Sequence, residues 1–269
     1  FRRGLLGSEG GCRPCPAPRR RRSRAARIIG WIAASLGILL IVAVIGIVIY
    51  SQVGVMAAEP EPLAAVKADP AIAITDDSAA IVLAPVEGET GDGLVFIPGA
   101  KVDPWAYAAK LSGIVESGTT VVITKPWLNL AFFDLRPLDA FTSLAPDVDT
   151  WAVGGHSLGG GRAGQLTESA QALILFASYC ANDLSTSGLP VLSLAGELDG
   201  LSTPEKIANA RPLLPAGADM VEIAGAAHSS FGDYGPQPGD GTPTISDADM
   251  TETLTSEVDR FLQTQVAGG

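Results

Sequence analysis

The chain has 269 residues, of which 47% are hydrophobic and 17% charged, and its formal net charge is −11. This length fits one or two domains with a buried core, and the composition excludes disordered, collagen-like and small disulfide-rich proteins. The charge is unevenly divided, because residues 1–30 carry nine Arg against one acid, Glu9, which leaves a net charge of −19 on the rest. A surface that acidic repels phosphates, so we expect no nucleic-acid partner for the folded part.

An uncharged apolar segment follows the basic N-terminal residues. It covers residues 28–50 and reads IIGWIAASLGILLIVAVIGIVIY. As a helix it would reach roughly 35 Å, enough to cross a bilayer core of about 30 Å. Trp31 and Tyr50 near its ends suit the membrane interface, and the Arg-rich side stays in the cytoplasm by the positive-inside rule. We predict an Arg-rich cytoplasmic tail over 1–27, a transmembrane helix over 28–50, and an extracytoplasmic remainder at the cell membrane.

The alternative is a cleaved secretory signal peptide, with residues 55–57 as the cleavage region. The apolar segment is longer than the 7 to 15 residues usual in a signal peptide, which favours a retained anchor. The sequence begins with Phe1 instead of Met, so we expect its true start to be missing.

The three cysteines do not form a recognisable site. Cys12 and Cys15 make a lone CxxC without a second ligand pair, so we expect a reduced, unstructured tail and no zinc site. Cys180 lies beyond the apolar segment and is predicted to be a small core residue or a spare thiol. We expect no metal and no organic cofactor.

Two regions follow the apolar segment. Residues 51–69 are rich in Ala, Glu and Pro, which favours an extended stalk, and 70–269 form the folded domain. In this domain apolar strands alternate with helical patterns, which predicts an α/β fold with a mainly parallel, twisted sheet covered by helices on both faces. The expected strands are 71–74, 79–85, 93–98, 119–124, 150–153, 172–176, 190–194 and 220–223. The expected helices are 104–116, 135–144, a helix after Ser157, 203–213 and 246–266.

A glycine-rich turn follows the strand at 150–153. It reads GGHSLGGG and contains G-x-S-x-G as Gly155, Ser157 and Gly159. In a strand-turn-helix setting this pattern is typical of a nucleophile elbow, in which glycines allow the tight turn that exposes the serine oxygen. We predict Ser157 to be a nucleophile; the alternative is an ordinary glycine-rich turn.

The partners of such a serine follow later strands. The chain has only two histidines, and His156 sits inside the elbow, so His228 is the candidate base. The alternative is that His228 is simply a solvated side chain in a loop. Asp199 is the first candidate for the acid that orients His228, with Glu197 as the fallback, and the order Ser, acid, His suits this sheet. Either acid could instead be a loop charge or a helix cap.

The remaining parts of the site are an oxyanion hole and a pocket. We assign the oxyanion hole to the backbone N–H groups of Leu158 and Ala100, with Lys101 close behind; Pro98-Gly99 is otherwise a simple turn. Apolar residues at 125–133 suit an acyl pocket or core packing. The residues predicted to bind substrate are Lys101, His156, Trp127, Leu130 and Phe132. Asp233, Gln237 and Asp240 are interpreted as turn residues.

Several segments together resemble the α/β-hydrolases, and more narrowly the small bacterial hydrolases related to dienelactone hydrolases. The resemblance covers about residues 71–266 and is carried by FIPGAKVDP at 96–104 with Tyr107, NLAF at 129–132, the elbow at 154–160, FASY at 176–179, FGDYG at 231–235 and GDG at 239–241. It implies the α/β-hydrolase fold and ester or related acyl hydrolysis by Ser157, Asp199 and His228. The elbow holds a serine where dienelactone hydrolases carry a cysteine, which argues against a dienelactone substrate.

The sequence therefore predicts a membrane-anchored extracytoplasmic serine hydrolase that acts on a small-molecule ester or acyl substrate. Two alternatives stay open. One is an acyltransferase with the same acyl-enzyme, and the other is a non-catalytic binding module on the same fold.

Overall fold

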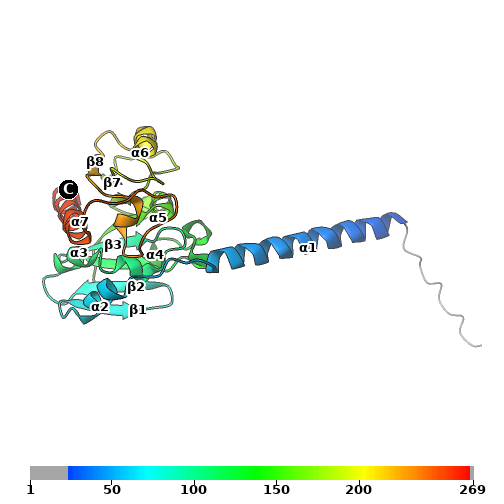
Figure 1. Cartoon of the computed structure of the whole chain (residues 1–269), viewed down its shortest axis with the longest axis horizontal. Helices are drawn as coiled ribbons and strands as arrows, with labels where there is room; N and C mark the ends of the chain where they lie inside the picture. Colours follow the sequence, from blue (N-terminus) through cyan, green and yellow to red (C-terminus); the bar gives the residue numbers. More distant parts are fainter. Residues whose placement is uncertain (1–23, 267–269) are drawn as a thin grey trace, which may run out of the picture. The chain divides into compact units, whose positions relative to one another are not determined.

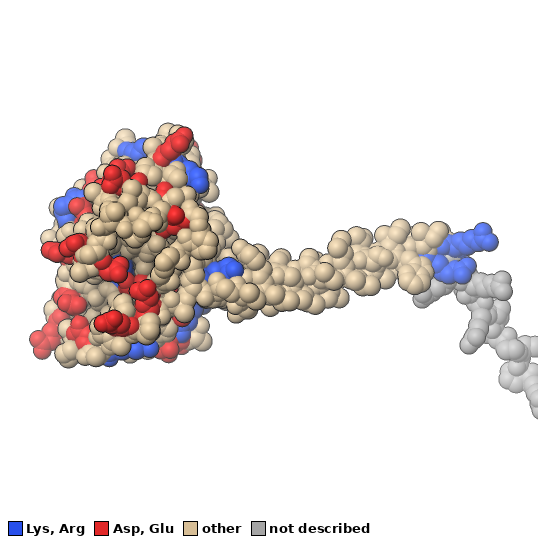
Figure 2. All heavy atoms as spheres, in the orientation of Figure 1, with Lys and Arg blue, Asp and Glu red and all other residues tan. Residues whose placement is uncertain are grey.

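The computed structural model describes residues 24–266, and Cys12, Cys15 and most of the Arg-rich tail lie outside them. The chain divides into two units, Phe1–Ile47 and Val48–Gly269. In the described part of the first unit, helix α1 (Arg24–Gln52, which runs on into the second unit) exposes its apolar side chains. By length and composition it is the one described helix that could cross a membrane. Figure 2 shows charged side chains on it only at its N-terminal end, where it contains Arg24 and Arg27.

The second unit is an α/β domain (Figure 1). Its strands are β1 (Ile72–Asp76), β2 (Ala80–Pro85), β3 (Asp92–Ile97), β4 (Thr120–Thr124), β5 (Thr150–His156), β6 (Ala172–Phe176), β7 (Val191–Gly196) and β8 (Asp219–Ile223). Its α-helices are α2 (Pro60–Ala68), α3 (Ser112–Glu116), α4 (Asp139–Thr142), α5 (Leu158–Ala163), α6 (Pro204–Ala210) and α7 (Asp247–Phe261). Short 3₁₀ turns are η1 (Pro104–Tyr107), η2 (Trp127–Asn129), η3 (Ala131–Phe133), η4 (Thr167–Ser169), η5 (Arg211–Leu213) and η6 (His228–Phe231), and a π-helical turn, η7 (Leu262–Val266), follows α7.

The eight strands form one sheet in the order β1-β2-β4-β3-β5-β6-β7-β8. Strands β3 to β8 are parallel, whereas β1 pairs with β2 and β2 with β4 in antiparallel register. This confirms the predicted α/β fold with a mainly parallel sheet. The carboxyl ends of the parallel strands meet at one edge, which is where ligands bind in open sheets of this kind.

The strands are apolar because both faces of the sheet are covered. In β3, Leu94 and Phe96 belong to one core cluster and Val95 and Ile97 to another. The first cluster includes side chains of α3 and α7, and the second includes side chains of α4 and α5, so the helices form a layer on each face (Figure 1). Alternate residues of each strand thus face different cores, which explains the unbroken hydrophobic runs.

The segment predicted to be an extended stalk is instead packed on the domain. Residues 60–68 form α2, whose Val66 is buried in the core, and Met56 pairs with Val102 in a β-bridge. The Pro-rich start that suggested a tether also fits the first turn of a helix. The N–H groups of that turn have no partner within the helix, so the missing N–H of Pro60 costs no hydrogen bond. The Ala-rich remainder then favours the helix.

Two predicted helices are shorter than expected. In the segment 135–144 only α4 is helical, because Pro137 restricts the residue before it and cannot donate to a preceding turn. The segment 104–116 is divided into η1 and α3. Both segments still cover the sheet near β4.

Candidate active site

The turn between β5 and α5 places Ser157 at the edge of the sheet. Its backbone has φ 54° and ψ −121°, a combination that residues other than glycine rarely adopt. The turn is held by the Ser157 N–H, which donates to the Phe176 carbonyl at 3.0 Å, and by Ser178 Oγ, which donates to the Ser157 carbonyl at 2.6 Å. Strain of this kind persists only where surrounding contacts fix it, and it is frequent at functional sites.

The flanking glycines are required by close backbone approaches. A Cβ on Gly159 would lie 2.0 Å from the Ile97 carbonyl oxygen, and one on Gly155 would lie 2.6 Å from the same oxygen. The carboxyl end of β3 therefore runs directly against the turn, and only glycine fits at either position.

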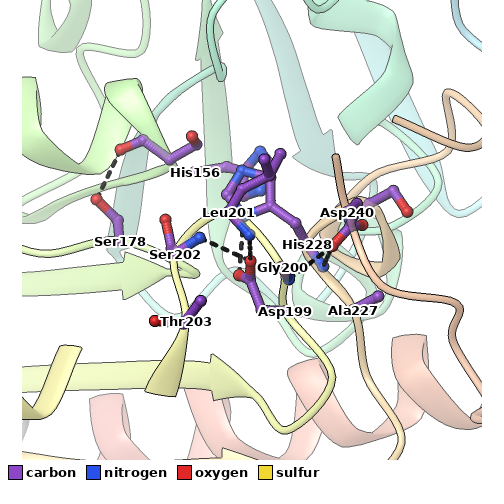
Figure 3. Close-up of polar contacts among 12 residues, drawn as sticks. His156, Ser178, Asp199, Gly200, Leu201, Ser202, Thr203, Ala227, His228 and Asp240 are labelled. Carbon is purple, nitrogen blue, oxygen red and sulfur yellow. Dashed lines mark hydrogen bonds and ion pairs between the residues drawn. The ribbon is translucent and has the colours of Figure 1, made fainter. Parts of the chain in front are cut away.

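His228 and Asp199 are hydrogen-bonded to each other. His228 begins η6 after β8, Asp199 follows β7, and His228 Nδ1 lies 2.8 Å from Asp199 Oδ2 (Figure 3). Both side chains are buried. Asp199 Oδ1 also accepts from the N–H groups of Leu201 and Ser202, each at 2.7 Å. These bonds fix the carboxylate, which in turn holds the imidazole with its Nδ1 as donor and its Nε2 free to accept a proton.

Glu197, the alternative acid, lies elsewhere. Its side chain is exposed, and its Oε2 accepts from the Gly225 N–H at 2.8 Å. The geometry therefore favours Asp199 over Glu197 as the partner of His228.

Asp240 supports this site, and sequence reasoning assigned it only to a turn. Its Oδ1 accepts from the N–H groups of Gly200 at 3.1 Å and His228 at 3.0 Å, and its Oδ2 accepts from Ser229 at 2.8 Å (Figure 3). Burial raises the pKa of this carboxyl, but the amide donors outweigh burial and lower it. The flanking glycines of Gly239-Asp240-Gly241 were the available signal, because a Cβ on Gly241 would lie 1.9 Å from the Leu198 carbonyl oxygen.

Ser157 and His228 line one cavity of about 440 Å³. The backbone donors assigned to an oxyanion hole, Ala100 and Leu158, belong to residues of its wall. The other lining residues are Phe132, Gly161, Ser178, Tyr179, Ala181, Leu201 and Ser202. No lining residue is an Asp, Glu, Lys or Arg, so the cavity suits an uncharged group of modest size.

Of the five residues expected to bind substrate, only Phe132 is part of this wall. Lys101 instead holds its Nζ 4.3 Å from the centre of the Tyr50 ring. Trp127 is half exposed, and neither it nor Leu130 lines the cavity. The loops after β6 and β7 supply the rest of the wall, including Tyr179, Ala181 and Leu201. The sequence did not predict that these residues line the cavity, because this depends on how the two loops fold back.

His156 is also outside the cavity wall, because it points into the core. Its Nδ1 lies 2.9 Å from the Tyr107 hydroxyl, which itself accepts from the Gly99 N–H at 3.0 Å. Through these two hydrogen bonds Tyr107 ties the loop after β3 to the elbow. Burial and the nearby His228 lower the pKa of His156 well below its usual value, so it is neutral.

Among residues 24–266 no group of three or more His, Cys, Asp or Glu side chains is arranged to hold a metal ion. Cys180 is buried, and burial raises the pKa of its thiol to about 11.

A family model described as "Alpha/beta hydrolase family" matches residues 93–252, which is more than half of the chain. The matched region runs from β3 into α7 and includes Ser157, Asp199, His228 and Asp240. Among curated proteins, no match to the chain is found.

Proposed function

Because the chain belongs to the α/β-hydrolase family, we propose that it is a serine hydrolase that cleaves carboxylic esters or related acyl bonds. The observation that carries the proposal is the shared cavity of Ser157, in a strained turn, and His228, hydrogen-bonded to Asp199. A nucleophile, a base and an acid that orients the base are the parts that acyl transfer to serine requires.

The reaction has two halves. In the first, His228 Nε2 takes the hydroxyl proton of Ser157 as the oxygen attacks the acyl carbonyl, and the imidazolium then protonates the leaving alcohol. In the second, His228 removes a proton from water as the water oxygen attacks the acyl-enzyme, and the imidazolium then returns the proton to the Ser157 oxygen as the acid is released. Asp199 stabilises the imidazolium in both halves, and the Leu158 and Ala100 N–H groups bind the tetrahedral oxyanion.

We propose further that α1 is a retained membrane anchor and that the hydrolase domain is extracytoplasmic. The proposal rests on the apolar length of α1 and on the arginines that precede it. A cleaved signal sequence would share both features, but its apolar part would be shorter.

The test uses a fluorophosphonate probe on the full chain in detergent, beside a Ser157→Ala variant. We expect the probe to label Ser157, identified by peptide mass spectrometry, and labelling to disappear in the variant. Ser202→Ala is the control, since Ser202 lines the same cavity and its bond to Asp199 is made by the backbone N–H, which the change keeps. Labelling that persists in Ser157→Ala would overturn the proposal.

The acid is tested by a matched pair. Asp199→Asn is expected to lower kcat by roughly 10⁴-fold, because the amide favours the wrong tautomer of His228. Glu197→Gln leaves the imidazole untouched and should keep nearly full activity. The reverse pattern would move the acid to Glu197.

The same chemistry gives the location test. A probe that cannot cross membranes labels Ser157 in intact cells if the domain is extracytoplasmic. Labelling only after lysis would overturn that location. Product analysis with added alcohols separates transfer to water from transfer to other acceptors.

A further inference from the structure

The residues that follow the apolar helix are hydrogen-bonded to the loops that surround the cavity. The Met56 N–H donates to the Lys101 carbonyl and the Asp103 N–H donates to the Met56 carbonyl, each at 2.8 Å. Asn129 Nδ2 donates to the Ser51 carbonyl at 3.2 Å. The loop after β3, which supplies Ala100, and the loop after β4 are thus both tied to the chain within a few residues of the end of α1.

A cation and an aromatic ring meet at the same place. Lys101 Nζ lies over the ring of Tyr50, which is exposed. Tyrosine and lysine are typical of the membrane interface, where an apolar body and a polar tip are both satisfied. If α1 spans the membrane, the loop that carries Lys101 lies at the level of the lipid headgroups.

Exposed apolar side chains gather on the loops beside this point. We define the apolar rim as Trp127, Phe132, Phe133, Leu135 and Tyr179, each at least 41% exposed. Among the described residues that follow α1, the other exposed large hydrophobic side chains are Val53, Val86 and, at 39%, Met220. Val53 directly follows the helix. Four of the five rim residues lie in the loop after β4, in which Asn129 bonds to both Ser51 and Lys101, so most of the exposed apolar surface is on a loop tied to the end of α1. Concentrated apolar surface of this kind marks an interaction site.

The apolar rim continues into the cavity. Phe132 and Tyr179 belong to both the rim and the cavity wall that contains Ser157. No Asp, Glu, Lys or Arg lines that wall. An acyl chain passing from the rim to Ser157 would therefore meet apolar and neutral surface along its path.

We infer that the apolar rim inserts into the outer surface of the bilayer. The substrate is then a membrane-borne acyl ester, whose chain enters the cavity from the lipid. The inference rests on the proposed hydrolase function and on α1 as an anchor. The occupant of the rim is the bilayer because the neighbouring chain, from Tyr50 to Met56, is the part that leaves the membrane.

The first test compares two substrates with the full chain reconstituted in lipid nanodiscs. One is a short-chain ester dissolved in water, and the other is a long-chain acyl ester held in the disc. The variant is Phe133→Ser/Leu135→Ser, which removes rim residues that do not line the cavity. The matched control is Val86→Ser/Met220→Ser, which removes two exposed apolar residues distant in sequence from the rim.

We expect the rim variant to lose about tenfold or more in kcat/KM on the disc-held ester, since interfacial binding scales with buried apolar area. Its kcat/KM on the dissolved ester should equal that of the unmodified protein, and the control variant should behave normally on both. An equal loss on both esters, or no loss on either, would overturn the inference. If the unmodified protein cleaves neither ester and is not labelled by fluorophosphonate, the proposed function itself fails.

The second test does not use activity. Leu135→Cys and Val86→Cys, each in a Cys12→Ser/Cys15→Ser background, carry an environment-sensitive dye on the new thiol. Brominated lipids in the disc should quench the dye at position 135 and leave the dye at position 86 unchanged. Equal quenching, or none at position 135, would contradict insertion of the apolar rim even in an active hydrolase.

Discussion

The Asp240 carboxylate accepts a hydrogen bond from the backbone N–H of His228 at 3.0 Å, and the same oxygen accepts one from Gly200 at 3.1 Å. Gly200 is next to Asp199, so one carboxylate fixes the two loops that bring Asp199 and His228 together. Asp240 touches neither the cavity nor the imidazole ring among the contacts described, and it acts by positioning.

Asp240→Asn should therefore lower kcat more than it raises KM. Asparagine keeps one acceptor oxygen, but its NH2 group cannot accept a hydrogen bond, so at least one of the N–H donors loses its partner. We expect a fall in kcat of about tenfold and a loss of roughly 1–3 kcal/mol in the free energy of unfolding, measured by ester kinetics and urea denaturation. Asp147→Asn, at an exposed position, is the control. Unchanged kcat in Asp240→Asn would show that the loops hold their positions without this carboxylate.

Gly159→Ala tests the close contact beneath the elbow. The new Cβ would lie 2.0 Å from the Ile97 carbonyl oxygen, and strand backbone cannot move away without disturbing the sheet. We expect a loss of at least about 1–3 kcal/mol in the free energy of unfolding.

Gly161→Ala is its matched control, because its Cβ would lie 3.5 Å from Phe132 Cζ and meet nothing closer. This change should be neutral or raise the free energy of unfolding by about 0.5–1 kcal/mol, as alanine favours a helix over glycine. Equal stability of the two variants would contradict the close approach of Gly159 to the Ile97 carbonyl oxygen.

The fold and the positions of Ser157, Asp199 and His228 could be predicted because the signals are local. Apolar strand runs alternate with helices, and each of the three residues follows a strand, so parallel strands bring them to one edge of the sheet. That these three residues meet at one edge follows from the sheet topology alone, without knowledge of side-chain packing.

Other features depend on long-range packing and had no local signal. Asp240 acts through amides of residues 200, 228 and 229, a relationship that exists only after two loops close. Residues 51–69 have the composition of a tether, yet Val66 is buried, because α2 packs against β1 and places this side chain in the core. His156 turns inward because Tyr107, distant in sequence, offers a hydrogen bond to its ring.

His156 should make the stability of the protein depend on pH. Burial and the nearby His228 lower its folded-state pKa well below 6.5, so the unfolded chain binds a proton that the folded chain does not. The contribution of His156 to the free energy of unfolding is therefore at its maximum above about pH 6.5. It falls as the pH decreases towards the folded pKa, by up to about 1.4 kcal/mol per pH unit.

His156→Gln removes this titration and should give a shallower slope between pH 7.5 and 5.5, measured by urea denaturation at several pH values. The comparison uses slopes, so an overall loss of stability in the variant does not affect it. Identical slopes would show that His156 becomes protonated within the folded protein.

Cys180 should be unreactive in the folded protein and dispensable for activity. Its thiol is buried, and the pKa, raised by burial to about 11, leaves roughly one thiol in a thousand ionised at pH 8. Iodoacetamide at pH 8 should leave residue 180 unmodified in the native chain and alkylate it in urea, as read by peptide mass spectrometry. Cys180→Ala should keep nearly full kcat, because the sulfur is absent from the cavity wall that holds Ser157 and His228. A folded Cys180→Ala protein without fluorophosphonate labelling of Ser157 would show instead that this thiol contributes to the site.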